Sequence, residues 1–225
     1  MTVHLDSADG ASGTVRGRRE RSTSDKRQRI FEAAATLFAE RGFDAASTQE
    51  IADRADVAAG TVFRYASSKA ELLLMVYNRE LRDAIDLGAR AAATHTDAID
   101  AVDALVQPVL AGSIGNPLTV VAYQRELLFG PATEKYRAEG LALVAELERV
   151  IASRLLTASG SPDNDELSGE ARRAARTVFA TLSLLLAEPS TGAHPEADPS
   201  QELRGQVAQI VRGFLATTSS ITARP

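Results

Sequence analysis

Apolar residues recur at helical spacing along most of the chain. Between residues 24 and 41, for example, Ile30, Ala34, Leu37 and Phe38 fall at i, i+4, i+7 and i+8 and form one apolar face. The same reasoning predicts further helices over residues 47–55, 59–65, 68–94, 98–111, 118–129, 133–158, 166–187 and 200–217. The sequence has no strand alternation and no hairpin signal. It therefore predicts an all-α fold of about nine helices.

The segment from Ser47 to Lys69 predicts two short helices joined by a tight turn, the layout of a helix-turn-helix over residues 47–66. Ser47 is a good N-cap, and Glu50 three residues later completes a capping box. Asp56 stands where the chain must turn, because aspartate tolerates left-handed dihedral angles. Val62 is the inward side chain of the second helix, which we expect over residues 59–65. This layout is typical of proteins that place a helix in a DNA groove.

At these residues the chain resembles the TetR family of transcriptional regulators. The family signature runs roughly A-G-V-S-x-G-T-x-Y-x-H/Y-F-x-S-K, and residues 55–69 read A-D-V-A-A-G-T-V-F-R-Y-A-S-S-K. The chain departs from it at Asp56, Ala58, Phe63 and Ala66. The loss of the serine at Ala58 removes an N-cap, a change that typically costs ~1 kcal/mol. The resemblance covers about residues 24–73.

The resemblance implies a DNA-binding surface on this helix pair. Ala59, Gly60 and Thr61 are expected closest to the base edges, where small side chains let the helix approach the major groove. By the same resemblance, four residues match positions that contact phosphates: Thr48, Arg64, Tyr65 and Lys69. An alternative for Tyr65 is that it packs between helices. The implied partner is a palindromic double-stranded DNA operator, bound by a dimer.

The net charge of −5 first argues against a nucleic-acid partner, but the distribution of charge reverses that conclusion. A basic arm precedes the helix pair, and its candidate DNA-contacting residues are Arg18, Arg19, Arg21, Lys26 and Arg27. Residues 1–23 are rich in Gly, Ser and charge, so we expect them to be disordered in the free protein. The alternative is that the arm is only a solvated tail. The expected domains are this arm, a DNA-binding domain over 24–83 and an effector-binding and dimerisation domain over 84–225.

By the same resemblance, the larger domain binds a small, largely apolar ligand. Its candidate ligand-contacting residues are Leu105, Val109, Tyr123, Gln124, Arg125, Leu127, Phe129 and Phe179. A few polar groups in an apolar cleft are typical of a small-molecule site. The same residues also suit a core and its rim, and that alternative stays open.

The helices over 166–187 and 200–217 are the predicted homodimer contact. Each carries an apolar stripe at helical spacing: Ala171, Ala174, Val178, Leu182 and Leu185 in one, and Leu203, Val207, Ile210 and Phe214 in the other. Pairing the stripes across a two-fold axis would make a four-helix bundle. The alternative is that both stripes pack inward within one chain.

Other function classes find no support in the sequence. The three histidines lack metal-binding spacing, and no catalytic or nucleotide-binding motif occurs, so we expect no enzyme, no metal and no cofactor. Zero cysteines fit a reducing compartment, and no apolar run approaches the ~20 residues that span a membrane, which predicts a cytoplasmic protein. The sequence thus predicts a ligand-released transcriptional regulator, a repressor by resemblance. The alternative is a helical DNA-binding or interaction protein without a small-molecule effector.

Overall fold

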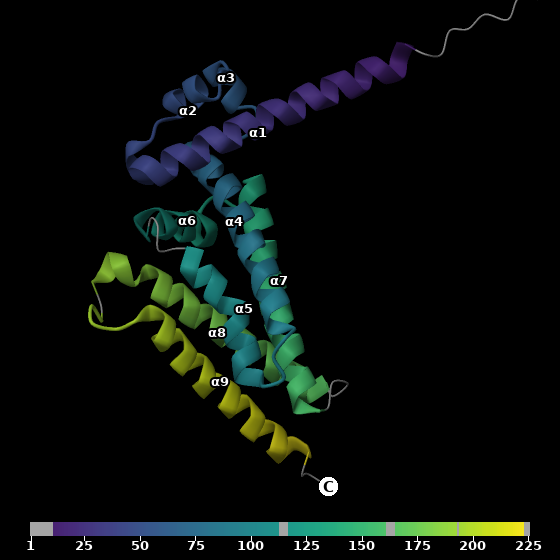
Figure 1. Cartoon of the computed structure of the whole chain (residues 1–225), viewed down its shortest axis with the longest axis vertical. Helices are drawn as coiled ribbons and strands as arrows, with labels where there is room; N and C mark the ends of the chain where they lie inside the picture. Colours follow the sequence, from purple (N-terminus) through teal and green to yellow (C-terminus); the bar gives the residue numbers. More distant parts are fainter. Residues whose placement is uncertain (1–10, 113–116, 161–164, 193, 223–225) are drawn as a thin grey trace, which may run out of the picture. The chain divides into compact units, whose positions relative to one another are not determined.

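The computed structural model describes residues 11–112, 117–160, 165–192 and 194–222, where it contains helices and turns but no strand (Figure 1). The helices are α1 (Ala11–Ala45), α2 (Thr48–Arg54), α3 (Ala59–Val62), α4 (Lys69–Ala92), α5 (Ala98–Gly112), α6 (Pro117–Phe129), α7 (Lys135–Ser159), α8 (Asp165–Thr191) and α9 (Pro199–Thr222). The prediction of an all-α fold with about nine helices is confirmed.

The chain divides into two compact units, residues 1–72 and residues 73–225. The division falls inside α4, earlier than the boundary at residue 83 that the sequence suggested. The reason lies in the second part of α4, where Ile85 is buried in the core of the second unit and Tyr77 and Leu81 pack against that core. These residues continue the apolar face of α4, so the helix serves both units.

The first unit contains α1, α2 and α3, and its buried residues include Ile30, Leu37, Ile51 and Val62. The helix α1 begins at Ala11, whereas residues 1–23 were expected to be disordered. Residues 1–10 lie outside the described residues, and a disordered arm in the free protein stays a prediction. Arginine and glutamate, which are frequent here, are good helix formers, so a charged segment can continue the helix without contributing to a core.

Local sequence signals set the ends of several helices. At Gly42 the backbone of α1 leaves the helical conformation, with φ 78° and ψ 169°. Glycine adopts such a positive φ at little steric cost, and the chain then turns toward α2. The capping box before α2 is formed as predicted between Ser47 and Glu50. The carboxylate of Asp97 accepts hydrogen bonds from the backbone N–H groups of Ile99 and Asp100 and so caps α5.

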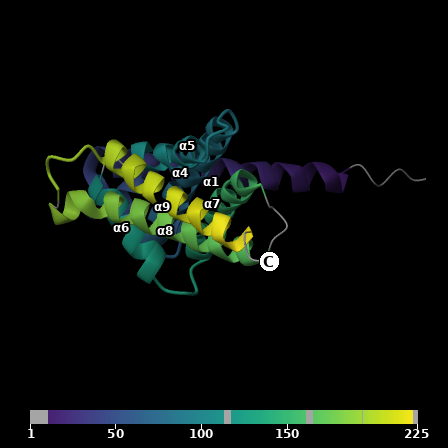
Figure 2. The same ribbon diagram turned by 90° about the horizontal axis from the view of Figure 1, so that it is seen from below.

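The core of the second unit lies between α5, α7, α8 and α9 and is made of side chains such as Leu105, Ile151, Val178 and Val207, all with 0% exposure. The helices α8 and α9 lie side by side in both views (Figures 1 and 2). The most extensive packing between helices of this unit is that of α8 against α7 and against α9. The two C-terminal helices are thus an integral part of this bundle.

The helix α8 extends further than the sequence predicted. It was expected to stop at Ala187 before a proline-rich loop, but it continues through Pro189 to Thr191. A proline removes one backbone donor, and Pro189 stands two residues before the last residue of the helix, so little of the helix follows it. The helix ends where Gly192 takes a positive φ of 64° and its N–H group donates to the carbonyl of Glu188.

The predicted dimer stripes pack inward, which corrects the sequence-based assignment. On α8, Ala171, Val178, Leu182 and Leu185 belong to the core of the chain itself, and Ala174 packs against it. On α9 the same core holds Leu203, Val207 and Phe214, and Ile210 packs against it. The stripes face inward because the bundle formed by α5 and α7 needs both helices to cover it. A dimer contact through these helices therefore has to use their outer faces.

No helix in the described part of the chain is long and apolar enough to cross a membrane.

Candidate functional site

The turn between α2 and α3 is built around Asp56, which has a left-handed backbone conformation with φ 51°. The guanidinium of Arg29, from α1, donates to both the backbone carbonyl and the carboxylate of Asp56, each at 3.3 Å. The N–H group of Val57 donates to the carbonyl of Ala52 at 3.0 Å. Aspartate is among the few non-glycine residues that adopt this conformation readily. The family glycine is therefore not needed here, because α1 holds the aspartate in place.

The helix α3 is shorter than the predicted segment 59–65. Its α-helical part ends at Val62, and residues 63–65 continue as turns in which Arg64 donates to the carbonyl of Thr61 and Tyr65 to that of Val62. Ala58 precedes it with an extended conformation and no side-chain cap, as expected from the loss of the family serine. The fully buried Val62 anchors α3 to the first unit.

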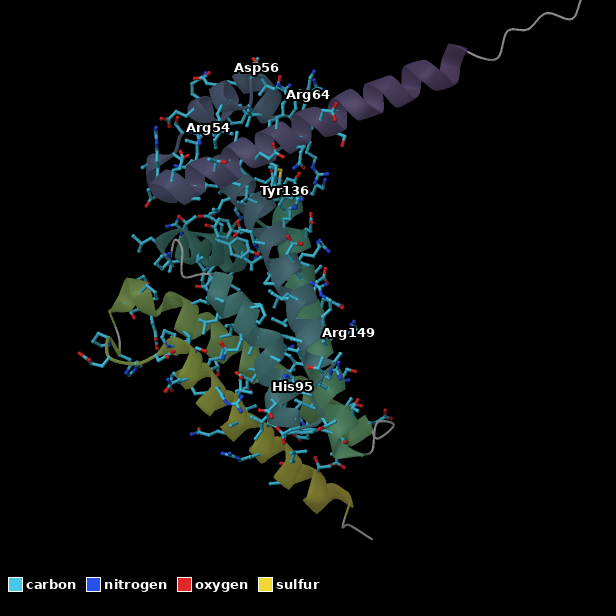
Figure 3. All side chains as sticks on the ribbon, viewed as in Figure 1. Arg54, Asp56, Arg64, His95, Tyr136 and Arg149 are labelled. Carbon is cyan, nitrogen blue, oxygen red and sulfur yellow. The ribbon has the colours of Figure 1, made fainter. Side chains whose placement is uncertain are left out.

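The outer surface of this helix pair carries small side chains beside the charged Asp56 and Arg64. Ala58 and Gly60 are exposed, and Ala59 and Thr61 are partly exposed. Asp56 and Arg64 project from the outer side of the pair (Figure 3). A Cβ atom built on Gly60 would meet nothing within 4 Å, and Gly60 does not have a positive φ. The fold itself therefore places no demand for glycine at this position.

The capping box has an electrostatic consequence. The Ser47 hydroxyl and backbone N–H donate to Oε2 of Glu50 at 2.8 and 3.0 Å, and the Arg41 guanidinium lies 2.5 Å from the other carboxylate oxygen. The hydrogen bonds from Ser47, followed by the charge of Arg41, lower the pKa of Glu50. The start of α2 is thus held by a carboxylate that favours its ionised form.

The second unit contains a cavity between α4, α5, α6, α7 and α8. Its volume is about 80 Å³, and the wall is mostly aliphatic and aromatic. The lining residues are Tyr77, Glu80, Leu81, Ala84, Val109, Gly112, Val120, Tyr123, Gln124, Leu127, Leu128, Val144, Leu147, Phe179, Leu182, Ser183 and Leu186. Apolar cavities with a few polar groups are typical small-molecule sites, although sites for drug-sized ligands are usually ~300 Å³ or more. The cavity in this conformation suits a small ligand.

Buried hydrogen bonds fix the aromatic wall of this cavity. The Tyr123 hydroxyl donates to Oδ1 of Asn78 at 2.9 Å, and Nδ2 of Asn78 donates to the backbone carbonyl of Tyr136 at 2.7 Å. The rings of Tyr77 and Tyr123 stack with centroids 5.6 Å apart. The Gln124 amide donates to the carbonyl of Ser183, which ties α6 to α8. Tyr136 itself stands near the start of α7 (Figure 3).

Residues 30–76 match the family model described as bacterial regulatory proteins of the tetR family. This segment contains the helix pair, the turn at Asp56 and the surface around Gly60 described above. This segment of the chain is thus similar to the tetR family of bacterial regulatory proteins.

Part of the chain is similar to curated transcriptional regulators. The chain is 28% identical over 144 residues to the transcriptional repressor KstR of Mycobacterium tuberculosis, a match that spans 63% of each protein. It is 37% identical over 87 residues to the transcriptional activator FasR of Mycolicibacterium smegmatis, across 39% of each. The matches thus span less than two thirds of these relatives.

Solved structures of transcriptional regulators match most of the chain. The FadR repressor of Thermus thermophilus, in complex with lauroyl-CoA, is 28% identical with a TM-score of 0.65 and covers 82% of this chain and 92% of its own. A transcriptional regulator from Rhodococcus sp. Rha1 is 22% identical with a TM-score of 0.61, covering 83% of this chain and 96% of its own. At 22% identity, the likeness to the Rhodococcus regulator shows a shared fold.

The predicted phosphate-contact residues differ in how much they are engaged within the chain. The Tyr65 hydroxyl donates to the backbone carbonyl of Thr23 at 3.2 Å, which supports the alternative that it packs between helices. The Lys69 amino group donates to the carbonyl of Asp44 at 3.1 Å and lies over the Phe43 ring. Arg64 is exposed at the outer surface. It is therefore better placed than Tyr65 or Lys69 to contact a partner.

The remaining predicted contacts lie at the start of α2 and along α1. Thr48 is the first residue of α2 and is half-buried. Lys26 and Arg27 are exposed on α1. The side chains of Arg18, Arg19 and Arg21 lie outside the described residues, although their backbone belongs to α1.

The cavity brings together most of the predicted ligand-contacting residues. Val109, Tyr123, Gln124, Leu127 and Phe179 line it. The other three do not, for reasons of helix phase: Leu105 is in the core with 0% exposure, Arg125 pairs with Glu126 at the surface, and Phe129 is 82% exposed.

The sequence analysis missed the contribution of α4 to the cavity. Tyr77, Leu81 and Ala84 line the wall at i, i+4 and i+7, and Glu80 lies among them. The apolar spacing was visible in the sequence, and a glutamate inside that face was the signal that marks a site. No group of three or more His, Asp or Glu side chains is placed to hold a metal ion in the described part of the chain.

Proposed function

We propose that the protein is a transcriptional repressor that binds a palindromic DNA operator as a dimer and is released by a small, largely apolar ligand. The observation that carries this proposal is the surface of α3 around Gly60. This glycine stands on the second helix of the helix-turn-helix, where a side chain would contact no atom of the chain, so the backbone there is open to the close approach of a partner. The major groove of DNA is such a partner for a helix-turn-helix. Such a regulator acts in the cytoplasm, where the operator is.

The family supports the choice of repressor. KstR is named a repressor, and the FadR structure is that of a repressor bound to lauroyl-CoA, whereas FasR is named an activator. In this chain the effector is expected in the cavity between α4 and α8. The helix α4 lines that cavity through residues 77–84 and begins in the first unit at Lys69, so a ligand that moves α4 would act on the DNA-binding unit directly.

The dimer contact is expected on the outer faces of α8 and α9. Leu184 on α8 is 65% exposed, and Thr177 and Ala180 are exposed on the same side at helical spacing. Small and apolar residues of this kind allow two helices to approach a symmetry mate closely. A two-fold dimer presents two copies of α3 to the two half-sites of a palindrome.

Selection from a random pool of DNA duplexes tests the proposal. We expect the protein to recover inverted repeats whose half-sites are about one helical turn apart. Recovery of single-stranded DNA only, or of duplexes without symmetry, would contradict it. Transcription in vitro from a promoter that carries the selected operator then separates repressor from activator.

A second candidate function is that of a DNA-binding regulator without a small-molecule effector. The small cavity volume of about 80 Å³ favours it, since effector sites are usually larger. A thermal-shift screen with small apolar compounds distinguishes the two, because a ligand that binds only the folded state raises its apparent stability. Compounds that shift the melting temperature and also release the operator would support the first function.

A further inference from the structure

The described wall of the cavity carries negative charge and no positive charge. Among the lining residues that the structure describes, Glu80 is the one charged side chain, and no lysine, arginine or histidine belongs to the set. Glu80 is itself exposed, so its carboxylate lies at the mouth of the cavity and not in its interior. The rest of the wall is apolar or aromatic apart from the amide of Gln124 and the hydroxyl of Ser183. A ligand in this cavity therefore meets a carboxylate at the entrance and no compensating cation.

The titration behaviour of the wall agrees with a negative potential. Burial and then the charge of Glu80 raise the pKa of Tyr77 to about 12. Burial, followed by Glu139 and Glu80, raises the pKa of Tyr123. Glu139 is paired with the Arg82 guanidinium at 3.0 Å. Glu80 therefore remains the acidic side chain that lies at the cavity wall and acts on both tyrosines.

The aromatic wall presents ring faces to the cavity. Tyr77 and Tyr123 are stacked, with their ring planes at 27°, and Phe179 lines the same cavity from α8. The polar tip of Tyr123 is directed to Asn78, which is not a lining residue, so the ring is the part of Tyr123 that contributes to the wall. Aromatic faces carry negative partial charge and attract cations. They also supply apolar surface for a hydrocarbon body.

We propose that the effector of this cavity is a small lipophilic amine, whose ammonium group is held at the mouth by the Glu80 carboxylate and whose hydrocarbon body lies against Tyr77, Tyr123 and Phe179. This inference rests on the proposed function, for which it names the class of ligand. A carboxylate or phosphate group at the same place would meet no cation among the lining residues that the structure describes and would be repelled by Glu80. The cavity thus selects for positive charge.

Three probes of matched length test the selection: hexylamine, 1-hexanol and sodium hexanoate. Their dissociation constants for the full-length protein are measured by calorimetry at neutral pH. We expect hexylamine to bind at least about tenfold more tightly than either of the others, a factor that corresponds to ~1.4 kcal/mol. In the same samples hexylamine, and not hexanoate, is expected to release the selected operator.

Two variants assign the selectivity to one side chain. Glu80→Gln keeps the size of the side chain and removes its charge, so hexylamine binding should weaken about tenfold while hexanol binding changes little. Asp86→Asn removes an exposed carboxylate from the same helix away from the cavity, and its hexylamine binding should match that of the native chain. The comparison separates a contact with Glu80 from a general effect of net charge.

The affinity for hexylamine should also depend on pH in a defined direction. The amine stays protonated throughout the acidic range. The pKa of Glu80 is raised, first because the cavity wall removes part of the water around its carboxylate although the residue is exposed, and then by the charge of Asp83. Binding should therefore weaken as the pH falls through this raised pKa, and the dependence should vanish in Glu80→Gln. The other titratable groups around Glu80 are Tyr77 on α4, Tyr123 on α6, and Glu139 on α7 with its partner Arg82.

Several outcomes would overturn the inference. These are hexanoate binding as tightly as hexylamine, unchanged hexylamine binding in Glu80→Gln, or no hexylamine binding at millimolar concentration. Operator binding without any ligand is recorded in parallel, so a wrong ligand class is distinguished from a wrong function. A protein that binds its operator and is released by hexanoate retains the proposed function and loses this inference only.

Discussion

At the scale of single residues, Gly60 and Arg64 are the positions where we expect contact with DNA. Gly60 lies on a helix although glycine weakens helices, and nothing in the chain occupies the space of its missing side chain. Arg64 is exposed after the end of the same helix, whereas the neighbouring Tyr65 is tied to Thr23. Because packing within the chain requires neither the missing side chain of Gly60 nor the exposed side chain of Arg64, these two residues are the best candidates for contacts with DNA.

Gly60→Ala should therefore separate stability from binding. Alanine improves helix propensity, so the free energy of unfolding is expected to rise by roughly 0.5–1 kcal/mol, while operator affinity falls because a methyl group meets the DNA. Chemical denaturation and gel-shift titration measure the two effects. Gly205→Ala on α9 is the matched control, since a Cβ atom there also meets nothing, and it should stabilise the chain without weakening binding. Equal operator affinity in Gly60→Ala would remove the argument for close approach.

Arg64→Ala should weaken operator binding by about the same factor for all sequences. A phosphate contact releases counterions, so its loss is expected to flatten the log–log salt dependence by roughly one unit per protein copy. Lys69→Ala should have a smaller effect on the slope, because its amino group is engaged with Asp44 and Phe43. Titrations at several salt concentrations provide the slopes. A changed base preference with an unchanged slope would reassign Arg64 to base contact.

At the scale of elements, close approach between helices sets the shape of the second unit. A Cβ atom on Gly88 of α4 would lie 2.3 Å from the backbone carbonyl oxygen of Leu105 on α5. Such a contact cannot be relieved by rotating a side chain, since the opposing atom belongs to the backbone. The crossing of α4 and α5 therefore depends on this glycine, and α4 in turn carries part of the cavity wall.

Gly88→Ala is accordingly expected to destabilise the protein by about 1–3 kcal/mol, despite the better helix propensity of alanine. Thermal and chemical unfolding measure the change, with Gly205→Ala again as the control of opposite sign. A Gly88→Ala variant as stable as the native chain would show that the two helices separate at little cost.

The capping box of α2 predicts a pH dependence of stability. The pKa of Glu50 is lowered in the folded chain from its ordinary value of 4.5. The stabilisation is therefore complete above that value and is lost as the pH falls through the lowered folded pKa. Compared with Glu50→Gln, the native chain should be more stable at neutral pH, and this difference should shrink below pH 4.5. Ser47→Ala removes the main cause of the shift and should reduce the same pH dependence.

At the scale of the whole molecule, the packing of α8 and α9 decides where a second copy can bind. The inner faces of both helices are used within the chain, so the outer face of α8 with Leu184 is the expected contact. A test of the dimer contact therefore needs a substitution on an outer face and not on an inner one. A charge at Phe214, which has only 5% exposure, would disrupt the core and would say nothing about the dimer.

Leu184→Glu should yield a folded chain that is monomeric and binds the operator weakly. A buried unpaired carboxylate at a dimer contact is costly, whereas at an exposed site it costs little. Leu118→Glu on α6 is the control, since Leu118 is 68% exposed and lies outside α8 and α9. Sedimentation and circular dichroism report oligomeric state and folding. A Leu184→Glu variant that remains dimeric would place the interface elsewhere.

The sequence by itself determined the helical class, the capping box at Ser47, the turn at Asp56 and the helix pair around residues 47–66. These features depend on local chemistry, because a cap, a turn or an apolar period involves residues a few positions apart. The family signature lies in the same segment and was recognisable for the same reason.

Tertiary structure alone decided which apolar stripe faces inward and which side chains line the cavity. The stripes on α8 and α9 suit a dimer contact and a core equally well in sequence, and only the position of α5 and α7 assigns them to the core. Likewise Leu105 and Val109 share one face of α5, yet only Val109 reaches the cavity. A helical period fixes which residues share a face, whereas the element that the face meets depends on contacts far apart in the chain.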